Sequence, residues 1–470
     1  MKIRFIGANE NVTGARTFVD TGAFRFLVDC GMVQERALLD RNWSPCLENP
    51  TTIDAVFLTH AHLDHCGWLP RLGKGGFTGK IYATAATVEL AKLILYDSAH
   101  IQEEDALFKQ KRHAKEKRKG PHPVVPLYTK DDVDDIVAHF VPVAYNKPCD
   151  LGHGVQITFY DAGHVLGSAF IEVACQSPEG VTKRFLFSGD LGRGNRPILR
   201  DPELFSHADK PVDCVVIEST YGDRVSDPIE TVDRQLADII NKTVARHGKV
   251  IMPVFAVERA QEMLYRLDGL QESGTLDASV PIFLDSPMAV EATMIFKRHK
   301  ECFDEETMKR AAQGGRLSNL SLLKTSDESR TLNNLRGPAI IMSSAGMCNA
   351  GRIKHHLANH IGNKANTICF LGYQAAGTLG RIIAEGNKSV RIFGQNRKVK
   401  AEIASVRGIS GHADQKQLLA WFDGIASGAP KHAFVIHGEQ KAARTLANLI
   451  RQRGQQTQVT VPEYGQTFEI

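Results

Sequence analysis

The chain has little that would tie it to a membrane, to a disulfide framework or to one sign of charge. Its 470 residues include nine cysteines, an odd number, and no two of them form a Cys-x-x-Cys pair. A disulfide scaffold and a cysteine zinc finger are therefore not expected. Lys and Arg number 57 against 53 Asp and Glu, which gives a net charge of +4. A polyanion must then be bound by a local patch, because the overall charge is too small to attract it.

Long hydrophobic runs and nucleotide-binding loops are also missing. No apolar stretch approaches the roughly 20 residues that a membrane-spanning helix needs. The first residues, MKIRFIG, read as a strand and not as a signal peptide. These features predict a cytoplasmic protein with no membrane partner. No segment matches a Walker A or dinucleotide-binding fingerprint, so we expect no nucleotide cofactor. The length predicts two or three domains.

The densest group of reactive side chains follows a short apolar strand. Residues 55–67 read AVFLTHAHLDHCG, and four ligand-type side chains occupy six consecutive positions: His60, His62, Asp64 and His65. Residues two apart in an extended chain point the same way, so the first two histidines can bind one ion together. Imidazole and carboxylate ligands suit zinc, with manganese or iron as poorer choices. The alternative, a chance cluster of surface histidines, does not explain the position at a strand end, and we interpret the segment as a metal site.

Other polar side chains stand at strand ends in the first half of the chain. Asp29 ends one strand, His164 lies between glycines in DAGHVLGS, and Asp190 follows a strand in the sequence Ser-Gly-Asp. Singly, each of them could be a turn residue. Together, His164 and Asp190 supply ligands that the first cluster lacks. An aspartate can also bridge two metal ions about 4 Å apart.

This ordered set resembles the metallo-β-lactamase superfamily of metallohydrolases. The resemblance implies an α/β (α+β) fold of the αββα sandwich type, with a binuclear zinc site at one edge of a sheet. It implies one zinc on His60, His62 and His164, a second zinc on Asp64 and His65, Asp190 between the two ions, and Asp29 as a supporting carboxylate. The superfamily hydrolyses lactams, thioesters, lactones and phosphodiesters, so the fold alone does not identify the substrate.

Motifs in the second half resemble those of the β-CASP nucleases, the branch of the superfamily that cuts nucleic acids. Glu218 ends a strand, His412 lies in Ser-Gly-His-Ala-Asp, and His437 lies in His-Gly-Glu. Strands also alternate with helices from residue 249 to 392, which predicts a parallel-sheet domain. The resemblance implies a β-CASP domain of parallel-sheet α/β type at 210–393. It is inserted between the two parts of the lactamase domain, at 1–209 and 394–470.

The resemblance extends along the whole chain and implies a function. It is strongest to bacterial and archaeal relatives of the endonuclease subunit of the cleavage and polyadenylation specificity factor. It implies a ribonuclease with two Zn²⁺, or Mn²⁺ in their place, that hydrolyses single-stranded RNA as an endonuclease or exonuclease. Asp64 would orient or deprotonate the attacking water, and His412, tuned by Glu218, would protonate the leaving 3′ oxygen. His437 would bind the second zinc, and a histidine there is associated with RNA-cutting members.

Three other functions compete with this one. A small-molecule metallohydrolase, such as a thioesterase or lactonase, would need the first six motifs but gives no reason for Glu218, His412 and the insert. A DNA nuclease is disfavoured by His437. A non-catalytic RNA-binding subunit is disfavoured because no ligand position is missing. The resemblance is compatible with a homodimer.

A few residues carry weaker expectations. Ser343, Ser344 and Thr378 stand where strands give way to helices and could hold backbone phosphates. Residues 109–120, KQKRHAKEKRKG, carry seven Lys and Arg against one Glu. They form either a solvated helix or loop, or a phosphate-binding patch. Glu258 stands where the family segment usually has glycine, and its carboxylate would alter contacts with RNA if it faced the substrate.

Overall fold

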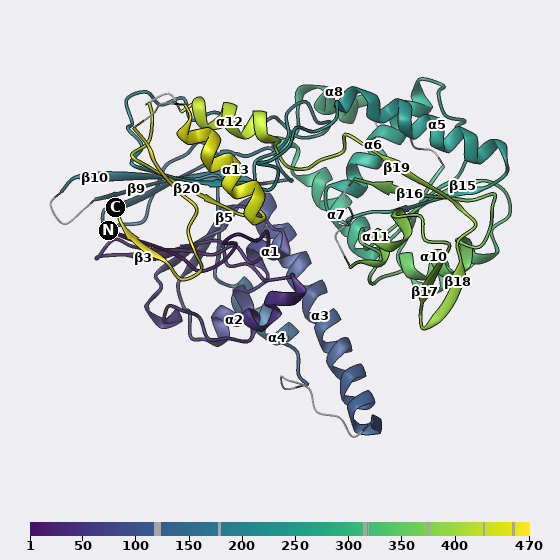
Figure 1. The fold of residues 1–470 in the computed structure, drawn as a ribbon, viewed down its shortest axis with the longest axis horizontal. Coiled ribbons are helices and arrows are strands. Elements are labelled where there is room, and N and C mark those ends of the chain that lie inside the picture. Colours follow the sequence, from purple (N-terminus) through teal and green to yellow (C-terminus); the bar gives the residue numbers. More distant parts are fainter. Residues whose placement is uncertain are drawn as a thin grey trace. The chain divides into compact units, whose positions relative to one another are not determined.

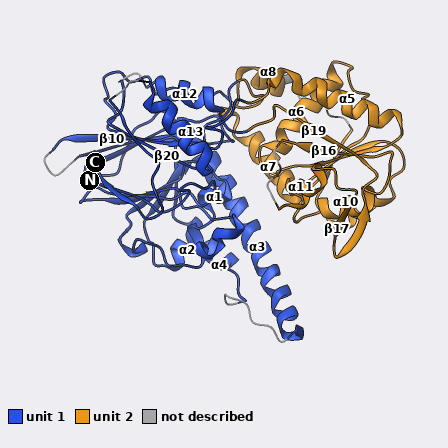
Figure 2. Cartoon of the chain, viewed as in Figure 1, with its two compact units in different colours: residues 1–194, 200–225, 411–470 blue, residues 195–199, 226–410 orange. Residues whose placement is uncertain are grey.

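The chain folds into two compact units (Figure 2). The computed structural model describes residues 1–116, 124–176, 180–313, 317, 319–372, 374, 377–425, 428–453 and 456–470. The first unit comprises residues 1–194, 200–225 and 411–470, and the second comprises residues 195–199 and 226–410. The second unit is therefore an insertion in the chain of the first.

The first unit contains two seven-stranded sheets (Figure 1). One has the order β22-β1-β2-β3-β4-β5-β6 and the other β21-β20-β11-β10-β9-β8-β7. The strands of the first sheet are β1 Lys2–Phe5, β2 Thr17–Asp20, β3 Arg25–Val28, β4 Ala55–Phe57, β5 Lys80–Thr84, β6 Phe140–Val143 and β22 Thr467–Glu469. Those of the second are β7 Cys149–Asp150, β8 Val155–Asp161, β9 Ala169–Gln176, β10 Thr182–Phe187, β11 Cys214–Glu218, β20 His432–Ile436 and β21 Gln458–Thr460. Aromatic side chains from both sheets, such as Phe57 and Phe159, form one buried core.

Helices cover the outer faces of both sheets. They are α1 Leu63–Cys66, α2 Leu69–Lys74, α3 Ala85–Glu116, α4 Lys130–Val137, α12 Gln415–Asp423 and α13 Gln440–Arg451. Leu418 of α12 and Leu446 of α13 pack on Val215 and Ile217 of β11, while α3 contacts β5 and β6. The predicted αββα sandwich is confirmed. None of the helices in the described ranges is long and apolar enough to cross a bilayer.

The second unit is built on a six-stranded sheet in which every neighbouring pair is parallel. The order is β14-β13-β15-β12-β16-β19. The strands are β12 Lys249–Pro253, β13 Ile282–Asp285, β14 Leu320–Leu323, β15 Ala339–Ser343, β16 Thr367–Leu371 and β19 Glu402–Val406. Its helices are α5 Val232–Ala245, α6 Arg259–Glu272, α7 Pro287–Arg298, α8 Glu305–Gln313, α9 Ser326–Thr331, α10 Ile353–His360 and α11 Leu379–Ala384. The predicted parallel-sheet α/β domain is confirmed.

Alternation along the central strands places helices on both faces of this sheet. Met252 of β12 packs with α5, α6 and α7, while its neighbour Ile251 packs with α10 and α11. A two-stranded antiparallel sheet, β17 Ser389–Ile392 and β18 Gln395–Lys398, joins the second cluster through Val390 and Ile392.

The two units meet in sequence at other residues than 210 and 393. Strand β11 pairs in parallel with β10 and β20 in a sheet of the first unit, so the chain enters the second unit at residue 226. Strand β19 pairs with β16, so the chain leaves the second unit at residue 410. Residues 195–199 also belong to the second unit, where the Asp304 amide donates to the carbonyl of Ile198.

The basic run lies partly on the end of α3. Residues 109–116 form the exposed last turns of this helix, and Arg112 pairs with Glu116 at 2.9 Å. Residues 117–120 of the run lie outside the described residues. The described part is a solvated helix end.

Candidate metal centre

The side chains singled out in the sequence come from strand ends of both sheets in the first unit. Strands β3 and β4 are parallel, as are β10, β11 and β20, so within each sheet their carboxyl ends lie at one edge. The residues at or just after these ends, or in the loops beside them, are Asp29, His60, His62, Asp64, His65, His164, Asp190, Glu218, His412 and His437. The structure brings these residues together in three overlapping groups.

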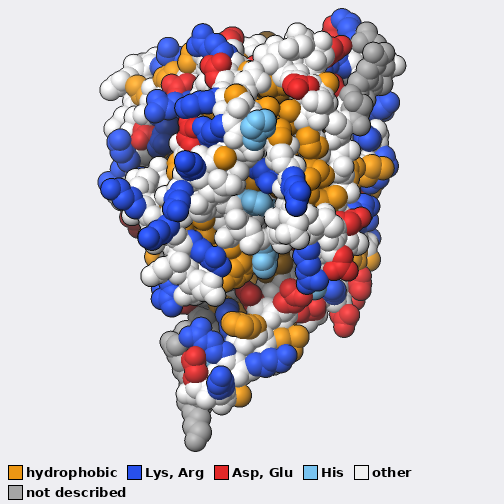
Figure 3. Space-filling model, turned by 90° about the vertical axis from the view of Figure 1, so that its right-hand side faces the viewer, with side chains coloured by type: hydrophobic (Ala, Val, Ile, Leu, Met, Phe, Trp, Pro, Cys, Tyr) orange, Lys and Arg blue, Asp and Glu red, His pale blue; other side chains and the backbone are white. Residues whose placement is uncertain are grey.

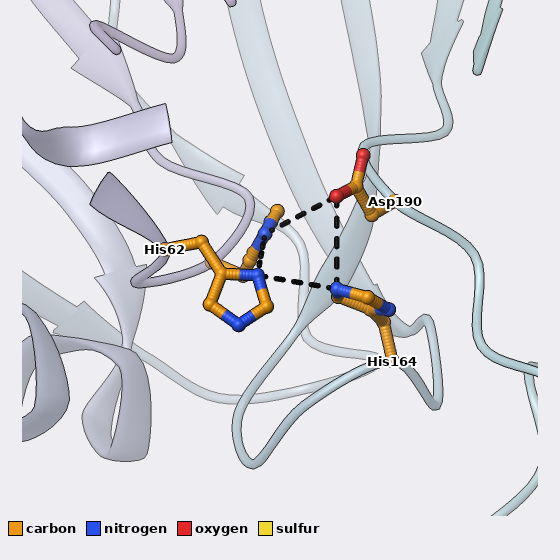
Figure 4. Close-up of side chains that lie close together, drawn as sticks. His62, His164 and Asp190 are labelled. Carbon is orange, nitrogen blue, oxygen red and sulfur yellow. Dashed lines mark hydrogen bonds and ion pairs between the residues drawn. The ribbon is translucent and has the colours of Figure 1, made fainter. Parts of the chain in front are cut away.

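The first group consists of three histidines and one aspartate (Figure 4). His60 Nε2 lies 3.1 Å from His62 Nδ1, which lies 3.3 Å from His164 Nε2. Asp190 Oδ2 lies 3.5 Å from His60 Nε2 and 3.6 Å from His164 Nε2. Four ligands on a tetrahedral zinc, at bonds of about 2.0–2.1 Å, are separated from one another by about 3.3 Å. The four donor atoms therefore fit one tetrahedral ion.

The second group consists of Asp64, His65 and His437. His65 Nε2 lies 3.0 Å from His437 Nε2, which lies 3.6 Å from Asp64 Oδ2. Asp190 Oδ2 also lies 3.4 Å from His65 Nε2, so one carboxylate reaches both groups. Among the described residues, the buried Oδ1 of Asp190 has no hydrogen-bond donor. A buried carboxylate oxygen without a donor is unfavourable, whereas a bound cation would satisfy it.

Neighbouring groups fix the orientation of the histidines. His65 Nδ1 donates to Asp29 Oδ2 at 2.7 Å, and the amide of Thr59 donates to Asp29 Oδ1 at 2.8 Å. His164 Nδ1 donates to the carbonyl of Gly411 at 3.0 Å. These bonds leave the Nε2 lone pairs of His65 and His164 directed at the metal groups, as second contacts of metal-bound histidines do.

Two threonines take part that the sequence did not single out. Thr59 Oγ1 lies 3.0 Å from His60 Nδ1, and Thr220 Oγ1 lies 3.1 Å from His437 Nδ1. A threonine has no ligand motif of its own. The only signal in the sequence was the position of each beside a motif residue.

Burial prepares the first group for metal binding. It lowers the pKa of His62 to about 4 and holds the pKa values of His60 and His164 well below the ordinary value. These imidazoles are neutral at pH 7, and only the neutral form has a lone pair for a metal. Burial alone would raise the pKa of Asp190, but His437 and His65 hold it well below the ordinary value.

The third group places Glu218 and His412 beside the metal ligands. Glu218 is buried and accepts from the amide of Leu191 at 2.7 Å, while His412 Nδ1 lies 3.3 Å from Glu218 Oε1. Burial alone would lower the pKa of His412, but Glu218 and Asp190 outweigh it and raise the pKa to about 9. His412 is therefore a cation at neutral pH, with a proton to donate.

The three predicted phosphate-binding residues lie in the second unit, with different surroundings. Ser343 is fully buried, and its hydroxyl donates to the carbonyl of Asp285 at 2.8 Å. Thr378 is the N-cap of α11 and accepts from the amide of Arg381. Ser344 is half-buried, with its hydroxyl 2.7 Å from that of Ser286. Burial removes Ser343 from the candidates, because its hydroxyl already serves the fold.

Glu258 does not face solvent. Its side chain is buried and pairs with Arg196 at 2.6 Å. Its backbone has φ 68° and ψ −61°, and the Arg259 amide donates to the carbonyl of Val257 at 2.9 Å. This is the rare positive-φ γ-turn, which glycine adopts more easily. The expectation that its carboxylate alters contacts with RNA is corrected, because the carboxylate points into the second unit.

Three family models match the chain in sequence order. They are a metallo-beta-lactamase superfamily domain at residues 18–181, a Beta-Casp domain at 260–383 and a Zn-dependent metallo-hydrolase RNA specificity domain at 396–462. Together they cover most of both units.

Relatives match over nearly the full length. The chain is 35% identical to Ribonuclease TTHA0252 of Thermus thermophilus over 473 residues, covering all of both chains. It is 31% identical to Transcription termination factor FttA of Methanocaldococcus jannaschii, covering 96% of this chain and 69% of the relative. A crystal structure of a protein of unknown function from Enterococcus faecalis matches 99% of both chains with a TM-score of 0.55 at 13% identity, a likeness of fold alone.

Proposed function

This chain belongs to the β-CASP branch of the metallo-β-lactamase superfamily, and we propose that it is a metal-dependent ribonuclease that hydrolyses phosphodiester bonds in single-stranded RNA. The observation that carries the proposal is the meeting of two ligand groups at Asp190, with the cationic His412 beside them. The name of the full-length relative and the matched RNA specificity domain support RNA as the polymer.

The proposed cofactor is a pair of Zn²⁺ ions. His60, His62 and His164 would hold one ion, Asp64, His65 and His437 the other, and Asp190 would serve both. Five histidines and two aspartates favour zinc over manganese, which prefers more oxygen ligands. Bound zinc supplies Lewis acidity, which offsets negative charge on phosphate oxygens and lowers the pKa of water.

The protein's own groups would handle the protons. The carboxylate of Asp64 would orient the attacking water and accept its proton. His412 would donate a proton to the leaving 3′ oxygen, so that the product carries a 5′ phosphate. Glu218 would hold the imidazolium of His412 in place through the 3.3 Å contact. Ser344 remains the proposed contact to a backbone phosphate, since its hydroxyl is half-exposed.

The test uses zinc-loaded protein with end-labelled single-stranded RNA and matched DNA, alongside Asp64→Ala and His412→Ala variants. We expect RNA to be cut by the parent and by neither variant, and the product ladder to distinguish internal from stepwise cleavage. Equal cutting by all three proteins would trace the activity to a contaminant. Preferential cutting of DNA, or hydrolysis of a thioester or lactone by protein that cuts neither polymer, would replace the ribonuclease proposal. Light scattering on the same preparation tests for a homodimer.

A further inference from the structure

A basic surface in the second unit contains none of the metal-centre residues. Residues 352–364 and 386–401 carry eight Lys and Arg and no Asp or Glu. The acidic groups near these segments are already engaged: Asp285 with Arg352, Glu385 with Arg381, and Glu402 with Lys242. Figure 3 shows a face of the molecule where Lys and Arg side chains gather, with hydrophobic side chains exposed among them.

The turn between β17 and β18 brings an aromatic ring into this surface. Phe393 is 51% exposed, and its ring lies 4.6 Å from that of His355, centroid to centroid. The ammonium of Lys354 lies over the same ring at 4.8 Å, and Arg391 Nε donates to the carbonyl of Gly394 at 3.1 Å. We name these residues, Lys354, His355, Arg391 and Phe393, together with Lys398 on β18, the hairpin surface.

The backbone of the turn disfavours phenylalanine. Phe393 and Gly394 form a two-residue hairpin loop and have φ values of 49° and 78°. Such a turn favours Asn-Gly, and a bulky side chain at positive φ is strained. Local folding therefore gives no reason for a phenylalanine here, and half of its surface stays in water. Strain of this kind points to a binding role.

The strand pairing adds cations on the outward face of the hairpin. Val390 and Ile392 point into the core, so Arg391 and its cross-strand partner Asn396 point outward. Lys398, opposite Ser389, lies on the same outward face and is exposed. Cations spaced along an exposed ring match the backbone phosphates and unstacked bases of a single strand.

We propose that the hairpin surface is a second binding site for single-stranded RNA, with a base stacked on Phe393 and phosphates held by Lys354, Arg391 and Lys398. The proposal rests on the proposed function, because it takes the bound strand to be the RNA that the metal centre cuts. It would favour long substrates, which can occupy both sites, over short ones.

The decisive variant is Phe393→Asn. It replaces the ring with the residue that the turn prefers, so the hairpin should keep or gain stability. Binding of oligouridylate is measured in the full-length, zinc-loaded protein, with His412→Ala present in every sample to prevent cleavage. We expect Phe393→Asn to weaken binding about tenfold. Unchanged affinity, with an unchanged melting temperature, would overturn the proposal.

Charge is tested with matched triple variants. Changing Lys354, Arg391 and Lys398 to Ala should reduce the slope of log affinity against log salt by about 2. The control changes Lys297, Lys300 and Lys309, three exposed lysines of the same unit, and should leave the slope as it is. Equal slopes in both would contradict the assigned contacts, and so would duplex RNA or anionic vesicles that compete as well as oligouridylate.

Cleavage of short and long RNA distinguishes this proposal from the proposed function. With His412 intact, Phe393→Asn should cut a short oligonucleotide like the parent and raise KM for a long one. If both proteins cut long RNA with the same KM, the second site is wrong while the ribonuclease stands. If neither cuts RNA, the function fails, and the binding measurements still test the hairpin surface.

Discussion

At the scale of single residues, the centre depends on which groups hold protons. Burial keeps the His60, His62 and His164 ring nitrogens free of protons, while Glu218 keeps one on His412. These opposite states arise within a few ångströms, because the ring of His164 lies only 4.5 Å from that of His412. Metal binding and acid catalysis are thus separated by the placement of one carboxylate.

His412→Ala should lower kcat by about 10²- to 10⁴-fold, the usual contribution of a general acid. An RNA with sulfur in place of the bridging 3′ oxygen needs no proton on its leaving group. The variant should therefore cut that substrate nearly as fast as the parent does. The measurement is the ratio of rates on the two substrates, together with the zinc content. An equal loss on both substrates would show that His412 acts in some other way.

Asp29→Ala should weaken metal binding by about 10- to 100-fold, because His65 would lose the acceptor that orients its ring. Competition with a coloured chelator measures the affinity. Asp135→Ala, an exposed change on α4, is the control. Affinity equal to the control would mean that the ring is held by other contacts.

The ligand residues could be predicted because their chemistry is rare in combination. His60 to His65 stand so close in sequence that their meeting hardly depends on tertiary structure. His164 and Asp190 were weak alone and were predicted only through the family resemblance. Thr59 and Thr220 were not predicted, because a hydroxyl behind a ligand leaves no pattern. Phe393 was missed as well, since its exposure and turn conformation exist only in the folded chain.

At the scale of elements, tight contacts between loops position the ligands. A Cβ atom on Gly31, after β3, would lie 1.5 Å from the carbonyl oxygen of Asp64. The loop after β3 and helix α1 can approach this closely only because the residue is glycine.

Gly31→Ala should therefore displace Asp64, abolish cleavage and destabilise the protein by about 3 kcal/mol. Gly362→Ala is the control, since a Cβ there would meet one atom, at 3.8 Å. Denaturant unfolding and zinc content provide the comparison. Wild-type zinc binding in Gly31→Ala would show that the loop can move without cost to the site.

The γ-turn at the start of α6 buries a carboxylate that should respond to pH. Burial raises the pKa of Glu258 from 4.5 to about 7, against the opposing effect of Arg196. The folded state then binds more protons than the unfolded state between these pH values. The free energy of unfolding should fall as pH rises through this range, by about 3 kcal/mol in all.

Glu258→Gln should remove this fall, so that its stability curve is flatter than that of the parent between pH 4.5 and 7. Urea unfolding across the range measures both curves. Glu305→Gln, an exposed change on α8, should leave the parent curve in place. Parallel curves for the parent and Glu258→Gln would show that the carboxylate is ionised throughout.

At the scale of the whole molecule, the sequence predicted two folds and an insertion but placed the junctions elsewhere. Strand β11 and strand β19 are short apolar segments that would suit either sheet. Only pairing with β20 in one case, and with β16 in the other, assigns them. Such partners are distant in sequence, so local patterns cannot identify them.

Metal ligands that span residues 60 to 437 should tie the first unit together. Removing zinc with a chelator should speed hydrogen exchange in the loops that carry the ligands, because ions bound only by the folded state stabilise it. Exchange in β12 and β15 of the second unit should stay unchanged, and added zinc should restore the rest. Faster exchange in the second sheet alone would contradict a centre confined to the first unit.

His412 and His437 follow the inserted unit in the chain. A ribosome makes residues in order, so a growing chain already carries His60 to Asp190 while these two histidines are still missing. The centre can be completed only when nearly all 470 residues have been made. Until then the nascent protein, held beside the messenger that encodes it, has neither its proton donor nor its last ligand. The order of the motifs thus spares the messenger during translation.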